Sequence, residues 1–424
     1  MSSDTCKLSD IADVQGGFAF KSADFSDTGV AVVKIANIQP PSVSLANVDR
    51  IAPDKLKGLE RFELLDGDIL MAMTGATVGK AGRFRLTEPA YLNQRVARIS
   101  AKKGHLFDDF LYAVVSLPGF DNLIEGASAG SAQANISAAG IGSVVIPKLS
   151  DSEQIQIGCI ARMLDDRMAL LRETNATLEA IAQALFKSWF VDFDPVHARA
   201  RGEQPAGLAP ELAALFPDSF EESALGLVPK GWKYVSLKEA TDIFDSKRIP
   251  LAGQERAKRK GPYPYYGAAA LMDWVDDYIF DGVYLLMGED GSVADASGYP
   301  ITQYVWGKIW VNNHAHVLQG RNGISTEHLM LALKGVNIQP FITGAVQAKL
   351  SQSNMWRIQF LMPTQSVASA FADLISPMFA KIRANSEQAQ TLANLRDTLL
   401  PRLISGQLRL PDAEAQLSEV GLCQ

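Results

Sequence analysis

A long segment in the first half of the chain carries a helical pattern of apolar positions. Residues 151–190 contain no proline and a single glycine, Gly158. Apolar side chains recur there every seven positions, at Ile157, Leu164, Leu171, Leu178 and Leu185. A repeat of seven places them on one stripe of a helix, which is typical of a coiled coil. The pattern predicts a spacer helix over 151–192.

The same pattern returns near the end of the chain. TLEAIAQALFKSWF begins at Thr177, and TLANLRDTLLPRLI begins at Thr391, which is 214 residues later. Shifted by this amount, the apolar set becomes Phe371, Met378, Asn385, Leu392 and Leu399. We expect the companion seam positions three residues further on, at Ile160 and Ile181 and at Leu374 and Leu395. A second helix is predicted over 365–406.

The repeat extends beyond the helices and defines the domains. SAQANIS at Ser131 corresponds to AVQAKLS at Ala345. This spacing is far longer than the roughly 20–50 residues of a solenoid repeat, so it indicates a duplicated unit of one domain and one helix. Strand-like runs such as GDILMAM and SVVIP indicate β-rich domains over 1–150 and 231–364. A proline-rich linker over 193–230, with one short helical turn near 210–216, and a loose tail over 407–424 complete the chain.

The length of the helices suggests a role. Some 38–40 residues at ~1.5 Å per residue make a rod of about 55–60 Å. This exceeds the ~34 Å of one turn of B-DNA, so the helices could hold two domains apart on a duplex. The alternative is that the two helices form an ordinary core pair and do not set the distance between the domains.

Composition narrows the class of protein. The 424 residues are 47% apolar, and no apolar run approaches the ~18 residues of a membrane span. The first residues lack the basic start and apolar stretch of a signal peptide. Cys6, Cys159 and Cys423 are odd in number and far apart, so we expect a reducing cytoplasm. The net charge of −7 argues mildly against nucleic acid, although a basic footprint can coexist with an acidic remainder.

Catalytic and metal-binding motifs are weak in this sequence. TGATVGKAG resembles a phosphate loop, but only three residues separate Gly75 from Gly79, and Ala81 follows the lysine. We interpret it as a glycine turn that presents Lys80 and Arg83 at a surface, with a plain solvated turn as the alternative. His314 and His316 alternate in a strand-like run, without a third ligand at a defined spacing, and GEDGS does not match a calcium loop. We predict no metal site and no catalytic role.

Basic, aromatic and amide side chains are better candidates for function. Cations contact phosphates, amides can bind adenine through two hydrogen bonds, and aromatic hydroxyls can reach groove edges. Each such residue, taken singly, is more often structural. The candidate DNA-binding residues are Lys80, Arg83, Gln94, Arg95, Gln133, Asn135, Lys247, Arg248, Lys258, Arg259, Lys260, Tyr263, Tyr265, Gln347 and Lys349.

The chain resembles the specificity subunit of type I restriction-modification enzymes. TGATVGKAG followed by YLNQRVARI, and QANIS ahead of VVIPKLSDSEQIQIGCIARMLDDRMALL, resemble that family's target-recognition domain. The strongest resemblance is LFKSWFVDFDPVHARARGEQPAGLAPELAALFPDSFEESALGLVPKGW, which is similar to the family's region between two recognition domains. In the second half, GEDGSVADASG stands in place of TGATVGKAG, and NNHAH in place of NQRVA.

The resemblance implies a fold and a role. It implies an α+β chain with two β-rich target-recognition domains, each followed by a long helix, the helices packed as an antiparallel coiled coil with pseudo-twofold symmetry. Each domain would bind one half of a split, asymmetric site in double-stranded DNA. The chain itself would bind no cofactor; S-adenosylmethionine and ATP would belong to two methyltransferase subunits and, in the full enzyme, two motor-nuclease subunits.

Two other classes of protein remain open from sequence. A stand-alone methyltransferase or nuclease would need catalytic motifs that are missing here. A coiled-coil scaffold joining two protein-binding domains would have no affinity for DNA.

Overall fold

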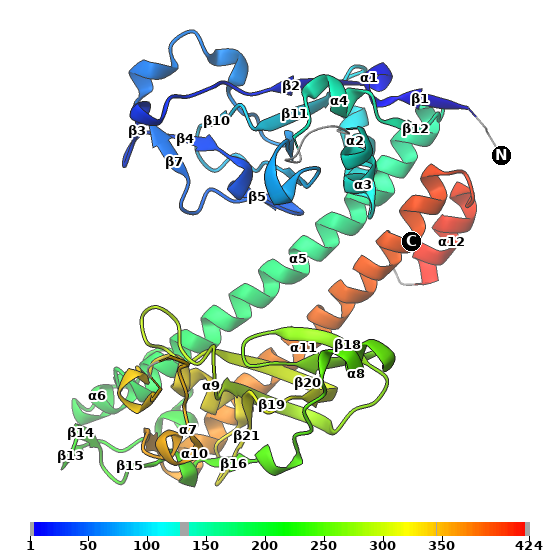
Figure 1. Ribbon diagram of the computed structural model, residues 1–424. Coiled ribbons are helices and arrows are strands. Elements are labelled where there is room, and N and C mark those ends of the chain that lie inside the picture. Colours follow the sequence, from blue (N-terminus) through cyan, green and yellow to red (C-terminus); the bar gives the residue numbers. More distant parts are fainter. Residues whose placement is uncertain (1–3, 128–134, 345, 420–424) are drawn as a thin grey trace. The chain divides into compact units, whose positions relative to one another are not determined.

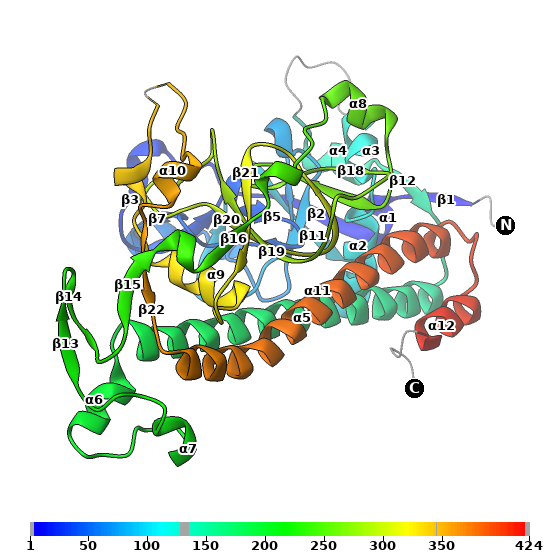
Figure 2. The ribbon, with the colours of Figure 1, turned by 90° about the horizontal axis from the view of Figure 1, so that it is seen from below.

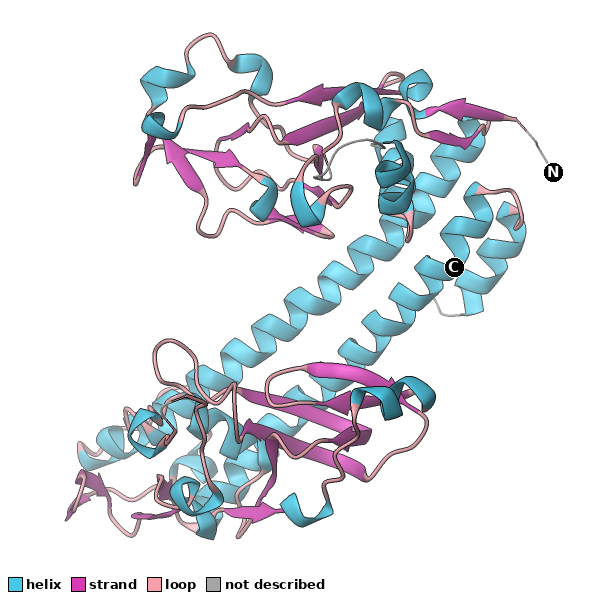
Figure 3. Ribbon diagram, in the orientation of Figure 1, coloured by secondary structure: helices cyan, strands magenta, loops and turns pink. Residues whose placement is uncertain are grey.

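The structure is a computed structural model that describes residues 4–127, 135–344 and 346–419. It divides into two compact units (Figure 1). Unit 1 comprises Met1–Leu171 with Gln388–Gln424, and unit 2 comprises Arg172–Glu387. Both contain helices and sheets (Figure 3).

Unit 1 is built on a six-stranded sheet. Its order is β2 (Ala12–Gly16), β11 (Val96–Ala101), β8 (Ile69–Ala72), β9 (Ala81–Arg83), β6 (Ser42–Val43) and β5 (Ile38–Gln39). A second sheet has the order β10 (Ala90–Leu92), β4 (Val30–Val33), β7 (Asp49–Ile51) and β3 (Phe25–Ser26). A further antiparallel pair joins β1 (Thr5–Lys7) to β12 (Val145–Pro147). The helices are α1 (Leu8–Ile11), α2 (Asp108–Val115), α3 (Phe120–Ala127) and α4 (Ala138–Gly142).

The central strand shows why an unbroken apolar run makes a strand here. All four residues of β8 are buried. Ile69 and Met71 point into the core that includes α5 and α11, whereas Leu70 and Ala72 point into the core under the second sheet. Because side chains alternate along a strand, a strand covered on both faces needs apolar residues at every position.

Unit 2 repeats this plan. Its six-stranded sheet has the order β16 (Thr241–Ile243), β21 (Ala315–Gly320), β19 (Phe280–Gly288), β20 (Thr302–Val311), β17 (Tyr263–Tyr266) and β18 (Leu271–Val275). In unit 1, β6 pairs with β9 in parallel, and β17 pairs with β20 in the same way here. The pair β15 (Lys233–Ser236) and β22 (Gln359–Met362) matches β1 and β12, and α9 (Thr326–Lys334) and α10 (Gln352–Met355) follow in the same places as α2 and α4. The duplication predicted from sequence is therefore present in the six-stranded sheet and in the short antiparallel pair, whereas the second sheet of unit 1 has no counterpart among the described residues of unit 2.

Two helices of 40 residues each run through the fold, α5 (Asp151–Phe190) and α11 (Gln365–Ile404). Within each unit they lie side by side and antiparallel (Figure 2). In unit 1, Asp165 pairs with Arg396. In unit 2, Asn175 bonds Asn385, and further along α5 Phe190 packs on Phe371. Each step forward on α5 thus matches a step backward on α11, so the expected antiparallel coiled coil is confirmed.

The seam uses the predicted leading positions and adds a second companion set. Ile157, Leu164, Leu171, Phe371, Leu392 and Leu399 are buried, and Leu178, Leu185 and Met378 are half-buried. Of the expected companions, Ile160 is buried, and Leu374 and Leu395 are half-buried against the cores. Further buried positions lie four residues after the leading ones, at Ala161, Met168, Ala182, Trp189, Ile375, Ile382, Ala389 and Leu403. Ile181, expected in the seam, is 42% exposed. Positions three and four residues after a leading seam residue lie on either side of the same helical stripe. Here the positions four residues on include the small side chains of Ala161 and Ala182, which are buried.

The seam is interrupted by polar groups that bond across it. Nδ2 of Asn175 donates to Ser386 and to the carbonyl of Ile382, at 3.1 Å each. Nδ2 of Asn385, which is 1% exposed, donates to Oδ1 of Asn175 at 2.8 Å. A buried polar pair in a seam fixes register, because a slipped alignment leaves both amides without partners.

The linker and the tail are more ordered than predicted. The linker holds α6 (Asp194–Ala200), α7 (Pro210–Ala213), and a hairpin of β13 (Phe220–Ser223) and β14 (Gly226–Pro229). Val196 and Phe216 are buried in the core of unit 2. The tail forms α12 (Leu410–Glu419), whose Ala413 and Leu417 are buried in unit 1. Among the described residues, no helix is long and apolar enough to cross a bilayer.

Candidate nucleic-acid interface

Three segments of unit 1 meet where β8 ends. They are residues 73–75, 93–95 and 135–136, which we call junction 1. The amide of Met73 donates to the carbonyl of Arg95 at 2.9 Å, and the amide of Ile136 donates to the carbonyl of Met73 at 2.9 Å. Thr74 forms a β-bridge with Asn135. The chain then turns at Gly75, whose φ of 78° favours glycine.

Unit 2 has the same arrangement where β19 ends. Residues 289–291, 312–314 and 349–350 form junction 2. The amide of Glu289 donates to the carbonyl of His314 at 2.9 Å, and that of Leu350 donates to the carbonyl of Glu289 at 2.8 Å. Asp290 forms a β-bridge with Lys349, and the turn follows at Gly291, with φ 74°.

The same sequence features fix both junctions locally. Buried Asn93 and Asn312 each accept, through Oδ1, a hydrogen bond from the amide two residues on, at 3.2 and 2.8 Å. An Asx turn of this kind orders a loop without a regular ladder. Directly after the third segment, Ser137 and Ser351 cap the short helices that follow.

Junction 1 presents polar side chains to solvent. Gln94, Arg95 and Asn135 are exposed, and Lys80 is exposed on the loop that follows Gly75. These four candidates come from three separate stretches of sequence, and the structure brings them to one edge of the sheet. Gln133 lies outside the described residues.

Junction 2 is rich in ion pairs instead. Oδ1 of Asp290 is hydrogen-bonded to Nδ1 of His314, whose side chain is 46% exposed. Nζ of Lys349 lies 3.6 Å from Oε1 of Glu289. Gln347 is exposed, and its amide lies beside Gly291. This junction therefore carries carboxylates, whereas the residues that define junction 1, all of them described, include none.

A largely buried network of charged side chains contacts junction 2 through Glu289. Asp245, Glu289 and His316 have ligand atoms close enough to hold a metal ion. Nδ1 of His316 lies 2.6 Å from Oδ2 of Asp245, and its Nε2 lies 2.9 Å from the carbonyl of Leu350. Both ring nitrogens of His316 therefore have an oxygen neighbour. Arg248 binds Glu289 at 2.7 Å and Asp245 at 3.4 Å, so protein cations already occupy the carboxylates.

Several candidate residues have partners inside their own domain. Arg248 belongs to the network just described. Arg83 pairs with Asp109 at 2.5 Å and lies over the ring of Tyr112, whose pKa burial raises to about 12. Tyr265 is 1% exposed, and its hydroxyl accepts a hydrogen bond from the amide of Leu251. These residues were expected at a surface because cations and tyrosines usually lie there, but each of these three is partnered inside the domain.

The basic stretch of unit 2 is partly neutralised. Arg259 pairs with Asp276 at 2.9 Å and lies over Trp310. Lys260 binds Asp273, and this hydrogen bond is the main reason that the pKa of Asp273 is lowered. Three candidates remain to be placed: Lys247 and Lys258 are exposed, and Tyr263 is half-buried against Tyr278.

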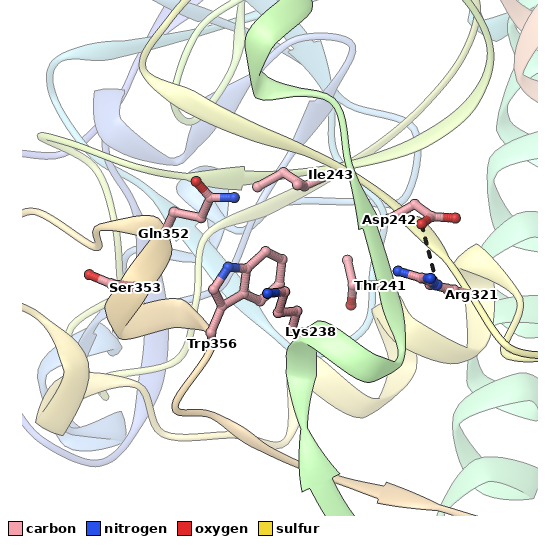
Figure 4. A pocket seen from close by; sticks show the side chains of 8 residues that line it. All are labelled: Lys238, Thr241, Asp242, Ile243, Arg321, Gln352, Ser353 and Trp356. Atoms are coloured by element: carbon pink, nitrogen blue, oxygen red, sulfur yellow. Dashed lines mark ion pairs between the residues drawn. The ribbon is translucent and has the colours of Figure 1, made fainter.

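A pocket of about 400 Å³ lies in unit 2 beside β16 (Figure 4). Gln352, Ser353 and Trp356 line one side, and Asp242 and Arg321, 3.6 Å apart, lie on the other. Lys238 adds a second cation, and Asp242 offsets part of this charge. These lining residues offer hydrogen-bond donors but no paired acids or nucleophile that would suggest catalysis.

A signal for two residues that were not named as DNA contacts was present in the sequence. Asp290 and His314 occupy the same places in junction 2 as Thr74 and Arg95 in junction 1. Placing DGS (290–292) under TGA (74–76) and NNHAH under NQRVA would have identified both. Glu289 was hidden because its role depends on Arg248 and Lys349, which are distant in sequence.

Comparisons with known proteins agree with this fold. The family model of the type I restriction modification DNA specificity domain matches residues 2–180 and 229–393. A putative type I restriction enzyme specificity subunit of Haemophilus influenzae is 34% identical over 149 residues, which is 35% of this chain and 37% of that protein. The HindI specificity subunit of the same organism is 26% identical over 58% of this chain and 65% of its own length. The chain thus spans less than two thirds of either relative.

A solved structure shows the same fold. The crystal structure of the type I restriction-modification system S subunit from M. genitalium has a TM-score of 0.56 and 16% identity, covering 95% of this chain and 96% of that one. Because the two matches to the family model together cover most of the sequence, we conclude that the chain belongs to the family defined by the type I restriction-modification DNA specificity domain, and that it carries this domain twice.

Proposed function

We propose that this chain is the sequence-specific DNA-binding subunit of a type I restriction-modification complex. Its two domains recognise the two halves of a split, asymmetric site in double-stranded DNA. The chain performs no chemistry; it directs adenine methylation, and restriction where a nuclease is present, by its partners.

The observation that carries this proposal is the pair of equivalent junctions. Each domain presents, at the same point of the same backbone frame, a set of polar side chains drawn from three segments. The sets differ, as two readers of different sequences would require. The exposed cations Lys80, Lys247 and Lys258 would supply salt-dependent attraction to phosphates.

Partners supply the remaining components. Two methyltransferase subunits and, in the full enzyme, two motor-nuclease subunits would assemble with the chain in the cytoplasm. S-adenosylmethionine and ATP would bind those partners, and the methyltransferase would flip the target adenine out of the duplex. The helix pair would set the distance between the half-sites.

Adenine methylation in living cells tests the proposal. Single-molecule sequencing would compare cells that express the chain with its partner methyltransferase against cells that express the methyltransferase alone. We expect a split motif only when both proteins are present. If both are expressed and soluble and methylation does not change, the chain is not the specificity subunit, and the scaffold role becomes the better explanation.

A further inference from the structure

Junctions 1 and 2 share one backbone frame but carry different side chains. The equivalent positions are Thr74 and Asp290, Arg95 and His314, and Asn135 and Lys349. What the two junctions share is held by main-chain hydrogen bonds and by the buried asparagines, and junction 2 adds the pairs of Asp290 with His314 and of Lys349 with Glu289. Residues here can therefore change without unfolding the loop, which is what a reader of variable sequence needs.

Resting on the proposed function, we propose that these three pairs of positions determine the base sequence of the two half-sites. Residues 74, 95 and 135 select bases in one half-site, and residues 290, 314 and 349 select bases in the other. The two junctions select different base chemistries, because Arg95 and Asn135 present a guanidinium and an amide, whereas Asp290 presents a carboxylate acceptor.

Junction 1 suits purines. The guanidinium of Arg95 is exposed and can donate two hydrogen bonds to O6 and N7 of guanine in the major groove. The carboxamide of Asn135, also exposed, can bond N6 and N7 of adenine. Thr74 between them is small, so it leaves room for a base edge.

Junction 2 suits a base with an exocyclic amino group. Nδ1 of His314 is hydrogen-bonded to Oδ1 of Asp290, so the imidazole orients this carboxylate. The carboxylate of Asp290 accepts hydrogen bonds. Cytosine N4 and adenine N6 offer the matching donor, whereas guanine presents only acceptors in the major groove. The pair of Asp290 and His314 therefore selects adenine or cytosine over guanine.

Single substitutions test this assignment in the complex with the methyltransferase. Arg95→Ala should relax one guanine position in one half-site, by about 5- to 150-fold in relative preference. His314→Ala should relax one adenine or cytosine position in the other half-site by a similar factor. His314→Arg should move the preference at that position toward guanine. Methylated motifs are read by single-molecule sequencing of cells that express each variant.

The split motif provides its own control. An unchanged half-site on the same DNA shows that the variant is folded and assembled. Lys258→Ala should lower methylation at all sites and leave the motif unchanged. If a variant abolishes methylation, the purified complex is used to select bound sequences from a randomised DNA library. Weak binding there still reveals the base preference.

The outcomes separate this inference from the proposed function. The inference is supported if each variant loses base preference in one half-site only, and if the Arg95 and His314 variants affect opposite half-sites. An unaltered motif in the three junction variants, or one substitution that changes both half-sites, overturns the inference while leaving the proposed function intact. Absence of a split motif with the natural chain instead overturns the proposed function.

Discussion

Protonation of a single buried histidine should make unit 2 sensitive to acid. His328 in α9 is 1% exposed and is surrounded by the rings of Phe190, Phe371 and Phe360 at centroid distances of 4.5, 5.1 and 5.7 Å. Among the described residues its Nδ1 has no hydrogen-bond partner. Burial lowers the pKa of His328 from 6.5 to about 3, because the charged ring loses its hydration among these apolar rings.

The size of the effect follows from this difference. Below pH ~6.5 the unfolded chain takes up a proton that the folded ring refuses until about pH 3. The free energy of unfolding is therefore unaffected by His328 above pH ~6.5, and it falls by about 1.4 kcal/mol per pH unit below that value. Between pH ~7.5 and pH ~5.0 the loss from this residue is about 2 kcal/mol.

Tryptophan fluorescence isolates this unit. The chain has six tryptophans, and all six, from Trp189 to Trp356, lie within Arg172–Glu387. Urea unfolding followed by fluorescence at the two pH values gives the loss of stability for the natural chain and for His328→Phe, whose ring cannot be protonated. The variant should lose about 2 kcal/mol less between these pH values. His105→Gln, at an exposed position in unit 1, is the control. Equal losses in the natural chain and in His328→Phe would refute the reasoning.

Two further predictions concern the helix seam and the DNA footprint. Asn175→Ala removes the acceptor of the buried Nδ2 of Asn385 and should destabilise unit 2 by about 1–3 kcal/mol in the same urea assay, whereas Thr177→Ala, at an exposed position, should cost little. A change below about 0.5 kcal/mol would mean that water replaces the missing bond. Lys80→Ala or Lys258→Ala should weaken DNA binding by the complex and lower the slope of log affinity against log salt by about 0.9 for each phosphate that is no longer neutralised. Lys381→Ala, at an exposed position on α11, is the control, and slopes equal to its slope would exclude these lysines from the footprint.

Sequence periodicity predicted the helices well, because a repeat of seven is a local property. It could not choose the companion seam set, since positions three and four residues after Ile157 both carry apolar side chains, Ile160 and Ala161. Only packing against α11 decides that Ile181 faces outward. The tail was taken as loose because α12 is short, and its apolar face is recognisable only once the core that receives Ala413 and Leu417 is known.

The interface was less predictable for a similar reason. Charge and residue type indicated Arg83, Arg248 and Tyr265, but their partners lie in other segments of the chain. Conversely, Asp290 and His314 were recognised as candidates only because they occupy the same backbone positions as Thr74 and Arg95, and no short sequence motif describes those positions. Residue type alone shows what a side chain can do, and the fold decides whether it is free to do it.

The division of unit 1 between two distant segments has a consequence for how the chain folds during synthesis. Unit 2 is complete once residue 387 has been made, but the core of unit 1 includes Leu399, Leu403 and Leu417 from the last segment. At about 5–20 residues per second, the first domain waits roughly 10–50 s after residue 171 for these residues. The stripe of Ile157, Leu164 and Leu171 is left uncovered by α11 throughout that time. The N-terminal domain is thus made first and finished last, and a ribosome that stops early releases a chain whose helix is prone to aggregate.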